Sequence, residues 1–191
     1  MENARKPTEK FTPTFENEIK YIKPKHNGTL GFRDILLMEL RTIYYTEKVL
    51  SKAFPKIIKN ACSYELIEAI TIHQEDTKNQ IIRIEDIFAA LNENPILQRC
   101  QAIDCLLQEI DDMVELTKFG SIRDAGIVLS LHKIEYYEIA SYSILNSYAE
   151  NLQEEHCAEL LFKSLNEEKV AQMRLAKIAS VVPFNGDREH L

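Results

Sequence analysis

Three glutamates occupy positions where the core of a helical bundle normally holds leucine. Glu47, Glu138 and Glu168 each interrupt an apolar stripe at helical spacing, and each lies in a different predicted helix. A buried carboxylate without a partner is costly, so it normally shifts its pKa, finds a counter-charge or binds a cation. The simplest explanation for three of them in one core is a shared cation, so the stripes predict a metal-binding bundle.

The rest of the periodicity predicts an all-α chain. Only five Gly and six Pro interrupt 191 residues, and apolar residues recur every three or four positions over long stretches. The long helices are predicted at 32–61, 64–91, 121–152 and 154–181, with a shorter helix inside the connection 96–120. Pro55 is expected to bend the first helix. Two long helices, a long crossover that carries a fifth, shorter helix, and two more long helices describe a ferritin-like four-helix bundle.

The remaining composition excludes several classes of protein. We expect residues 1–30 to form a flexible N-terminal tail, residues 31–182 the bundle and residues 183–191 a C-terminal tail. A net charge of −7 argues against nucleic-acid binding. No apolar run approaches the roughly 18 residues of a membrane span and no secretory signal is visible, so a cytoplasmic location is the default. The four cysteines form no CxxC pair, and we expect reduced thiols.

All four long helices carry side chains that can bind a metal. Hard divalent cations such as Mn(II) and Fe(II) favour oxygen ligands with some imidazole, and two such ions would hold several carboxylates ionised in an apolar interior. The known pattern takes one Glu from each of two helices and Glu-x-x-His from the other two, which this chain approximates imperfectly. The candidate metal ligands are Glu47, His73, Asp76, Gln80, Glu135, Glu138, Glu168 and Gln172.

The two halves of the chain also resemble each other weakly. Residues 43–47, IYYTE, parallel residues 134–138, IEYYE. The pattern EDxxxQ at 75–80 parallels EExxxQ at 167–172. Each half would then supply one carboxylate from its first helix and one from its second. This approximate two-fold repeat is the symmetry that a two-metal site would use.

Each candidate also has a simpler interpretation without a metal. Glu47 precedes Lys48 and would suit a surface salt bridge, and Glu135 would suit the edge of the stripe with a tyrosine as its partner. His73 would suit a core histidine with satisfied hydrogen bonds, or a residue that supports a ligand. Asp76 lies at the edge of the inward face, and its carboxylate could simply be solvated. We prefer the metal site because these simpler interpretations would have to hold on four helices together.

Six segments match the pattern of a known family: IYYTEK at 43–48, HQEDT at 73–77, RIE at 83–85, CQAI at 100–103, IEYYEIASY at 134–142 and LNEEK at 165–169. In these segments the chain resembles the ferritin-like bacterial stress proteins known as YciE/YciF. The resemblance covers roughly residues 30–180, and its most specific piece is the third long helix. It implies a ferritin-like fold, a homodimer, a di-iron or related dimetal site and a link to general or osmotic stress.

Four positions depart from that family pattern. Thr42 stands where the family commonly has Asp, Asp76 where Glu is usual, Tyr136 where His is common and Gln172 where Asp is common. An Asp at position 76 reaches less far than a Glu, and Gln172 would be a neutral ligand. These changes weaken the expectation of two bound ions.

The ligand set and the resemblance lead to two main functions. The first is a redox protein with two iron or manganese ions, which oxidises Fe(II) or handles peroxide or dioxygen and would be an oxidoreductase with a small oxidant as its partner. The alternative is a non-enzymatic, stress-associated helical scaffold in which the metal site is partial or lost. Iron storage in a closed cage ranks lower, because the long tail and crossover do not suggest a shell.

Overall fold

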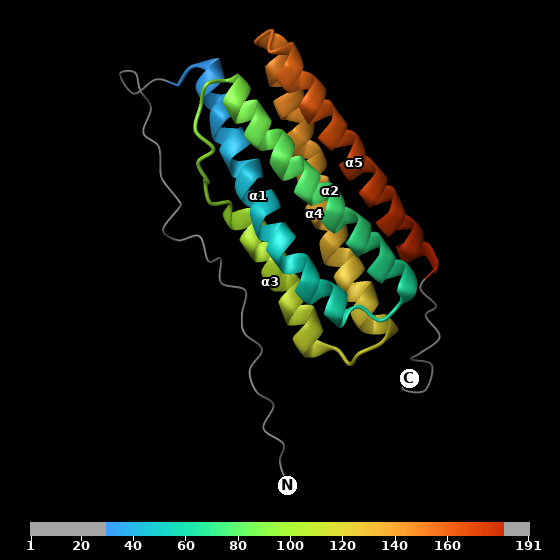
Figure 1. The fold of residues 1–191 in the computed structure, drawn as a ribbon. Coiled ribbons are helices and arrows are strands. Elements are labelled where there is room, and N and C mark those ends of the chain that lie inside the picture. The colour runs from blue at the N-terminus through green and yellow to red at the C-terminus, as the bar shows by residue number, and fades with distance from the viewer. Residues whose placement is uncertain (1–29, 182–191) are drawn as a thin grey trace.

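The computed structural model describes residues 30–181, which form four long helices with a fifth helix along one side (Figure 1). This confirms the predicted all-α, ferritin-like bundle with a shorter helix in the crossover. The tails expected before residue 30 and after residue 182 lie outside the described residues. The helices are α1 (Phe32–Asn60), α2 (Tyr64–Ala90), α3 (Gln101–Leu116), α4 (Ser121–Asn151) and α5 (Glu155–Val181).

The four long helices close into a ring. α1 packs against α2 and α4, while α5 packs against α4 and α2. α3 lies outside this ring, along α4 and α1. The ring therefore encloses one core, and each long helix presents one face to it.

Local signals in the sequence set the helix ends. Ser63 caps α2 by accepting a hydrogen bond from the Leu66 amide at 3.4 Å. Gly120, just before α4, has a φ of 146° that glycine tolerates and other residues avoid. The buried carboxylate of Asp124 accepts hydrogen bonds from the amides of Cys62 and Ser63, both at 2.7 Å. Asp124 thus ties the start of α4 to the start of α2.

α1 runs unbroken through Pro55, where the sequence predicts a bend rather than an end. Its buried face is apolar at both ends, with Leu40 and Ile43 before Glu47 and Leu50 and Phe54 after it. The same order holds on α4 and α5, where a fully buried glutamate lies near the middle of an apolar stripe. The bundle therefore has apolar ends and a polar centre.

α3 is held against the ring by both polar and apolar contacts. The Tyr45 hydroxyl donates a 2.7 Å hydrogen bond to Asp104, and Lys56 forms a 2.7 Å ion pair with Asp111.

None of the helices in the described part of the chain is long and apolar enough to cross a membrane.

Candidate metal centre

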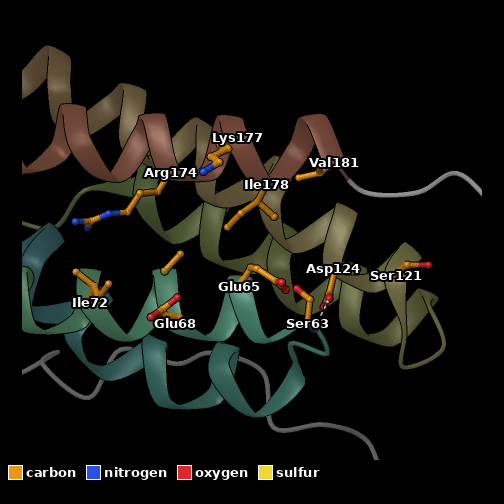
Figure 2. A pocket seen from close by; sticks show the side chains of 11 residues that line it. Ser63, Glu65, Glu68, Ile72, Ser121, Asp124, Arg174, Lys177, Ile178 and Val181 are labelled. Atoms are coloured by element: carbon orange, nitrogen blue, oxygen red, sulfur yellow. Dashed lines mark hydrogen bonds between the residues drawn. The ribbon is translucent and has the colours of Figure 1, made fainter.

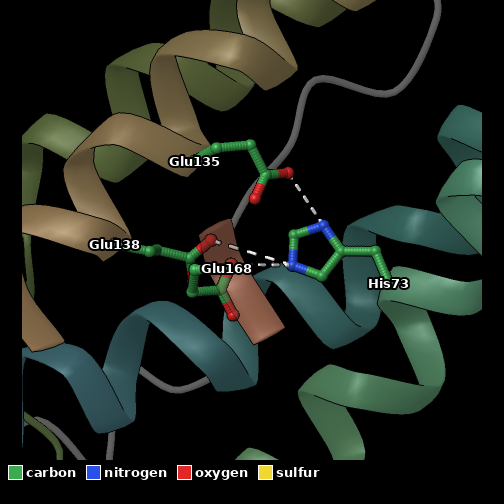
Figure 3. Close-up of side chains that lie close together, drawn as sticks. All are labelled: His73, Glu135, Glu138 and Glu168. Atoms are coloured by element: carbon green, nitrogen blue, oxygen red, sulfur yellow. Dashed lines mark ion pairs between the residues drawn. The ribbon is translucent and has the colours of Figure 1, made fainter. Parts of the chain in front are cut away.

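Four ligand-type side chains converge at the polar centre of the bundle. His73 comes from α2, Glu135 and Glu138 from α4, and Glu168 from α5, and all four are buried. One ligand atom from each lies within 4.8 Å of the others. We call these four residues the central cluster. Figure 3 shows the His73 ring between Glu135 on one side and Glu138 and Glu168 on the other.

His73 contacts all three carboxylates of the central cluster. Its Nδ1 lies 2.9 Å from Glu135 Oε1, and its Nε2 lies 3.3 Å from Glu168 Oε2 and 3.9 Å from Glu138 Oε2. Burial opposes a charge on the ring, but Glu135 and Glu168 outweigh it and hold the pKa of His73 well above its usual value. The two carboxylates therefore favour the protonated imidazole, which is the only group of the central cluster that can carry a positive charge.

Glu47 extends the cluster toward α1. Its side chain is fully buried, and its Oε1 accepts a 2.5 Å hydrogen bond from the Tyr142 hydroxyl. Its other oxygen, Oε2, has no hydrogen-bond partner among residues 30–181. Of the nearby charges, Glu168 acts on it most strongly. All four long helices thus contribute to the polar centre.

The carboxyl groups do not share one protonation state. Burial raises the pKa of Glu47 to about 8 and that of Glu135 to about 7. Burial and the charge of Glu168 raise the pKa of Glu138 well above its usual value. Burial opposes the charge of Glu168, but contacts with His73 outweigh it and lower the pKa of Glu168. Without a metal, the contacts favour the ionised form of Glu168 beside His73, and burial favours the protonated forms of Glu47 and Glu138.

Gln80 lies beside the cluster as a hydrogen-bond donor. Its amide nitrogen donates to Glu168 Oε1 and, at 3.2 Å, to Glu167 Oε2. Arg83 pairs with the same Glu167 oxygen and donates to Ser164 Oγ at 3.1 Å. The sequence predicts Gln80 as a ligand, whereas in the structure it holds one oxygen of Glu168 in place. Such outer partners commonly orient metal ligands.

The residues of the polar centre fit a divalent transition-metal ion. Buried polar atoms normally have hydrogen-bond partners, yet Glu47 Oε2 and both carboxylate oxygens of Glu138 have none within the described bundle. Opposed ligand atoms around an ion bound at about 2.1 Å lie roughly 4.2 Å apart. The separations within 4.8 Å in the central cluster are close to that span. Carboxylates with one imidazole also form the donor set that iron and manganese accept.

Two predicted ligands do not join the cluster. Asp76 is only half-buried and acts electrostatically on Glu167. The Gln172 amide nitrogen lies 3.0 Å from His132 Nε2 and 3.2 Å from the Tyr136 hydroxyl. Gln172 is thus turned away from Glu168, toward the outer side of α4.

The positions that depart from the family pattern lie away from the cluster. Tyr136 is 57% exposed, and Thr42 is half-buried with its hydroxyl bonded to the Met38 carbonyl at 3.0 Å. None of the four substituted positions belongs to the central cluster.

Sequence reasoning also missed Tyr142 as a partner of the site. Tyr142 is fully buried and lies four residues after Glu138 on the inward side of α4. That spacing places both side chains on neighbouring turns of one face. A buried tyrosine also needs a partner for its hydroxyl. The four-residue spacing from Glu138 and the need of a buried hydroxyl for a partner could therefore have indicated Tyr142 from the sequence.

Comparisons with known proteins agree with this architecture. A family model described as a domain of unknown function (DUF892) matches residues 31–183. The chain belongs to this family. Protein YciF of Escherichia coli (strain K12) is 33% identical over 147 residues, which is 76% of this chain and 89% of that protein. The resemblance to the YciE/YciF-like stress proteins is thereby confirmed.

Two solved structures of the same type match most of the chain. The crystal structure of the E. coli stress protein YciF has a TM-score of 0.76 and 31% identity, and covers 80% of this chain and 96% of its own. YcfI, described as a putative structural protein from Rhodopseudomonas palustris, has a TM-score of 0.76 and 37% identity, and covers 78% of this chain and 96% of its own. The homodimer and the cytoplasmic location stay predictions.

Proposed function

We propose that this chain is a dimetal-carboxylate protein of the bacterial stress response, which binds iron or manganese at the centre of its bundle and handles peroxide or dioxygen or oxidises Fe(II). The observation that carries this proposal is the convergence of His73, Glu135, Glu138 and Glu168 in a core that leaves several of their ligand atoms without hydrogen bonds. A cation would give those atoms the partner that the protein does not supply.

One ion would be held by the central cluster, where His73 and Glu135 line one side. A second ion would use Glu47 with Glu138 and Glu168. Glu138 would be available to both ions, because neither of its oxygens has a hydrogen bond within the described residues and the charges of both Glu47 and Glu168 act on it.

The bound metal would supply electrons to a small oxidant such as peroxide or dioxygen, and the chain's own residues would hold the metal and exclude water. Tyr142 and Gln80 each fix one oxygen of a carboxylate, which leaves the other oxygen of Glu47 and Glu168 for the ion. The apolar residues on both sides of the polar centre keep bulk water away. The description of YciF as a stress protein supports the physiological setting.

A non-enzymatic scaffold is the second candidate, and one specific observation favours it. Protonated His73 already pairs with Glu168 and Glu135, so the centre is charge-balanced without a metal. The description of YcfI as a putative structural protein is consistent with such a role. In this case metal would raise the thermal stability by mass action without any turnover of oxidant.

Elemental analysis after anaerobic loading with Fe(II) or Mn(II) tests the proposal. We expect about two ions per chain in the wild type, fewer in Glu138→Gln, and wild-type content in Glu159→Gln, a control at an exposed position of α5. A wild type that takes up no metal would overturn the proposal. If the wild type does bind metal, peroxide consumption in proportion to metal content would favour the redox function over the scaffold.

A further inference from the structure

A groove of about 700 Å³ runs between α2 and α5, outside the polar centre. Figure 2 shows Arg174 and Ile72 toward one end of this groove and Val181 and Ser121 toward the other. Both walls carry charged side chains, but the surface between them is mostly apolar. Because Ile72 immediately precedes His73 in α2, the end at Ile72 is the one next to the central cluster.

A much smaller cavity lies between this groove and the central cluster. Its volume is about 10 Å³, and its lining includes His73, Glu135 and Ala171. Ala69 lines both the groove and the small cavity. A cavity of roughly 10–15 Å³ holds one water-sized molecule. This small cavity therefore touches the imidazole and one carboxylate of the cluster, and Ala69 borders both it and the groove.

Arg174 supplies an unused hydrogen-bond donor on this path. It lies in the groove three residues after Ala171 on α5, and its Nη1 is buried without a hydrogen-bond partner in the described part of the chain. Buried donors of this kind normally have a partner, and a guanidinium prefers an anionic or strongly polar acceptor. Lys177 adds a second positive charge on the same wall. Glu65 and Glu68 line the facing α2 side, so the groove as a whole suits a small polar molecule that accepts a hydrogen bond from Arg174.

We propose that the groove between α2 and α5 is the entrance for a small oxidant of the peroxide class, that Arg174 receives it, and that the cavity beside His73 and Glu135 holds it next to the bound metal. This rests on the proposed metal-binding function. It adds to that function a route, a receiving residue and a size limit, because the space beyond Ala69 is only about 10 Å³.

Azide binding to the full-length, Co(II)-loaded protein tests the route, with Co(II) as the spectroscopic probe and azide as the small anion. Ala171→Leu places a larger side chain into the small cavity, and Arg174→Gln removes the charged donor. Lys163→Gln is the control, since Lys163 is an exposed cationic residue of α5 away from the groove. The visible absorption of Co(II) reports azide binding without any turnover.

Azide should change the Co(II) spectrum of the wild type and of Lys163→Gln with equal affinity. Azide affinity should fall at least tenfold in Ala171→Leu and about tenfold in Arg174→Gln, which loses a hydrogen bond from a charged group. Wild-type azide affinity in Arg174→Gln with full Co(II) content would overturn the route and leave the metal function standing. A wild type that binds no Co(II) would overturn both. If Ala171→Leu fails to fold by circular dichroism, Arg174→Gln alone decides.

Discussion

The hydroxyl of Tyr142 donates a hydrogen bond of 2.5 Å to Oε1 of Glu47, and both side chains are fully buried. The two residues lie on different helices, α4 and α1, so this bond crosses the core. It favours the ionised form of Glu47 against the effect of burial. The Tyr142 hydroxyl therefore fixes Oε1 of Glu47 and leaves Oε2 as the oxygen that a cation would contact.

Replacement of Tyr142 by phenylalanine should weaken both folding and metal binding. The free energy of unfolding should fall by roughly 1–3 kcal/mol, because a buried acceptor loses its donor. Without the hydrogen bond the pKa of Glu47 should rise further, so metal affinity at neutral pH should fall. Urea unfolding and a metal titration measure the two effects. Tyr136→Phe, at an exposed position on the same helix, should change neither, and equal effects in both variants would contradict the assigned role of Tyr142.

Gln80→Leu and Gln172→Leu form a matched pair of substitutions. Gln80 donates to Glu168, whereas Gln172 contacts His132 and Tyr136 outside the cluster. Loss of the Gln80 amide should weaken metal binding by about 10- to 100-fold, as is usual for residues that orient ligands. Gln172→Leu should leave the metal affinity unchanged. Calorimetric titration with Mn(II) measures both, and a larger effect at Gln172 would restore it as a ligand.

The stability of the metal-free protein should fall as the pH rises from about 5 to about 8. The pKa of Glu47 is raised to about 8 and that of Glu135 to about 7, so the folded state binds more protons than the unfolded state in this window. The raised pKa of His73 acts in the same direction, because its stabilising charge is lost as the pH rises through that value. The lowered pKa of Glu168 affects the stability only below this pH range, where that carboxylate becomes protonated.

Urea unfolding across this pH range tests that expectation. Metal loading should flatten the pH dependence, since the ion replaces the protons, and a pH-indicator dye should record proton release on loading. A metal-free protein whose stability rises between about pH 5 and about pH 8 would show that the buried carboxyls are ionised in the folded state.

Gly126→Ala should destabilise the contact between α3 and α4. A Cβ at position 126 would lie 2.9 Å from Met113 Sδ and 3.2 Å from Met113 Cβ. Overpacking of this kind costs about 1–3 kcal/mol, which exceeds the gain of up to about 1 kcal/mol from alanine in a helix. Combination with Met113→Ala should reverse the strain, and thermal unfolding of the three variants measures the coupling. A stabilised single variant would mean that Met113 moves aside freely.

The helices were predictable because their signals are local. Apolar spacing fixed the buried face of each helix, and residues such as Ser63 and Gly120 marked the ends, so the observed bounds agree with the expected ones within a residue. The inward position of Glu47 followed from the same periodicity. The partners of these side chains were not predictable, because they depend on contacts between helices. Gln80 lies on an inward stripe like a ligand, and only its distance to Glu168 shows that it is a donor instead.

The order of the chain places one more constraint on the polar centre. His73 belongs to the first pair of long helices, whereas Glu135, Glu138 and Glu168 belong to the second pair, with Glu168 on the last helix. Domains fold as units and the N-terminal part is synthesised first. A growing chain that has not yet released α5 holds His73, Glu135 and Glu138 but lacks Glu168. The full set of four ligand-type side chains therefore forms only when the last helix joins the bundle.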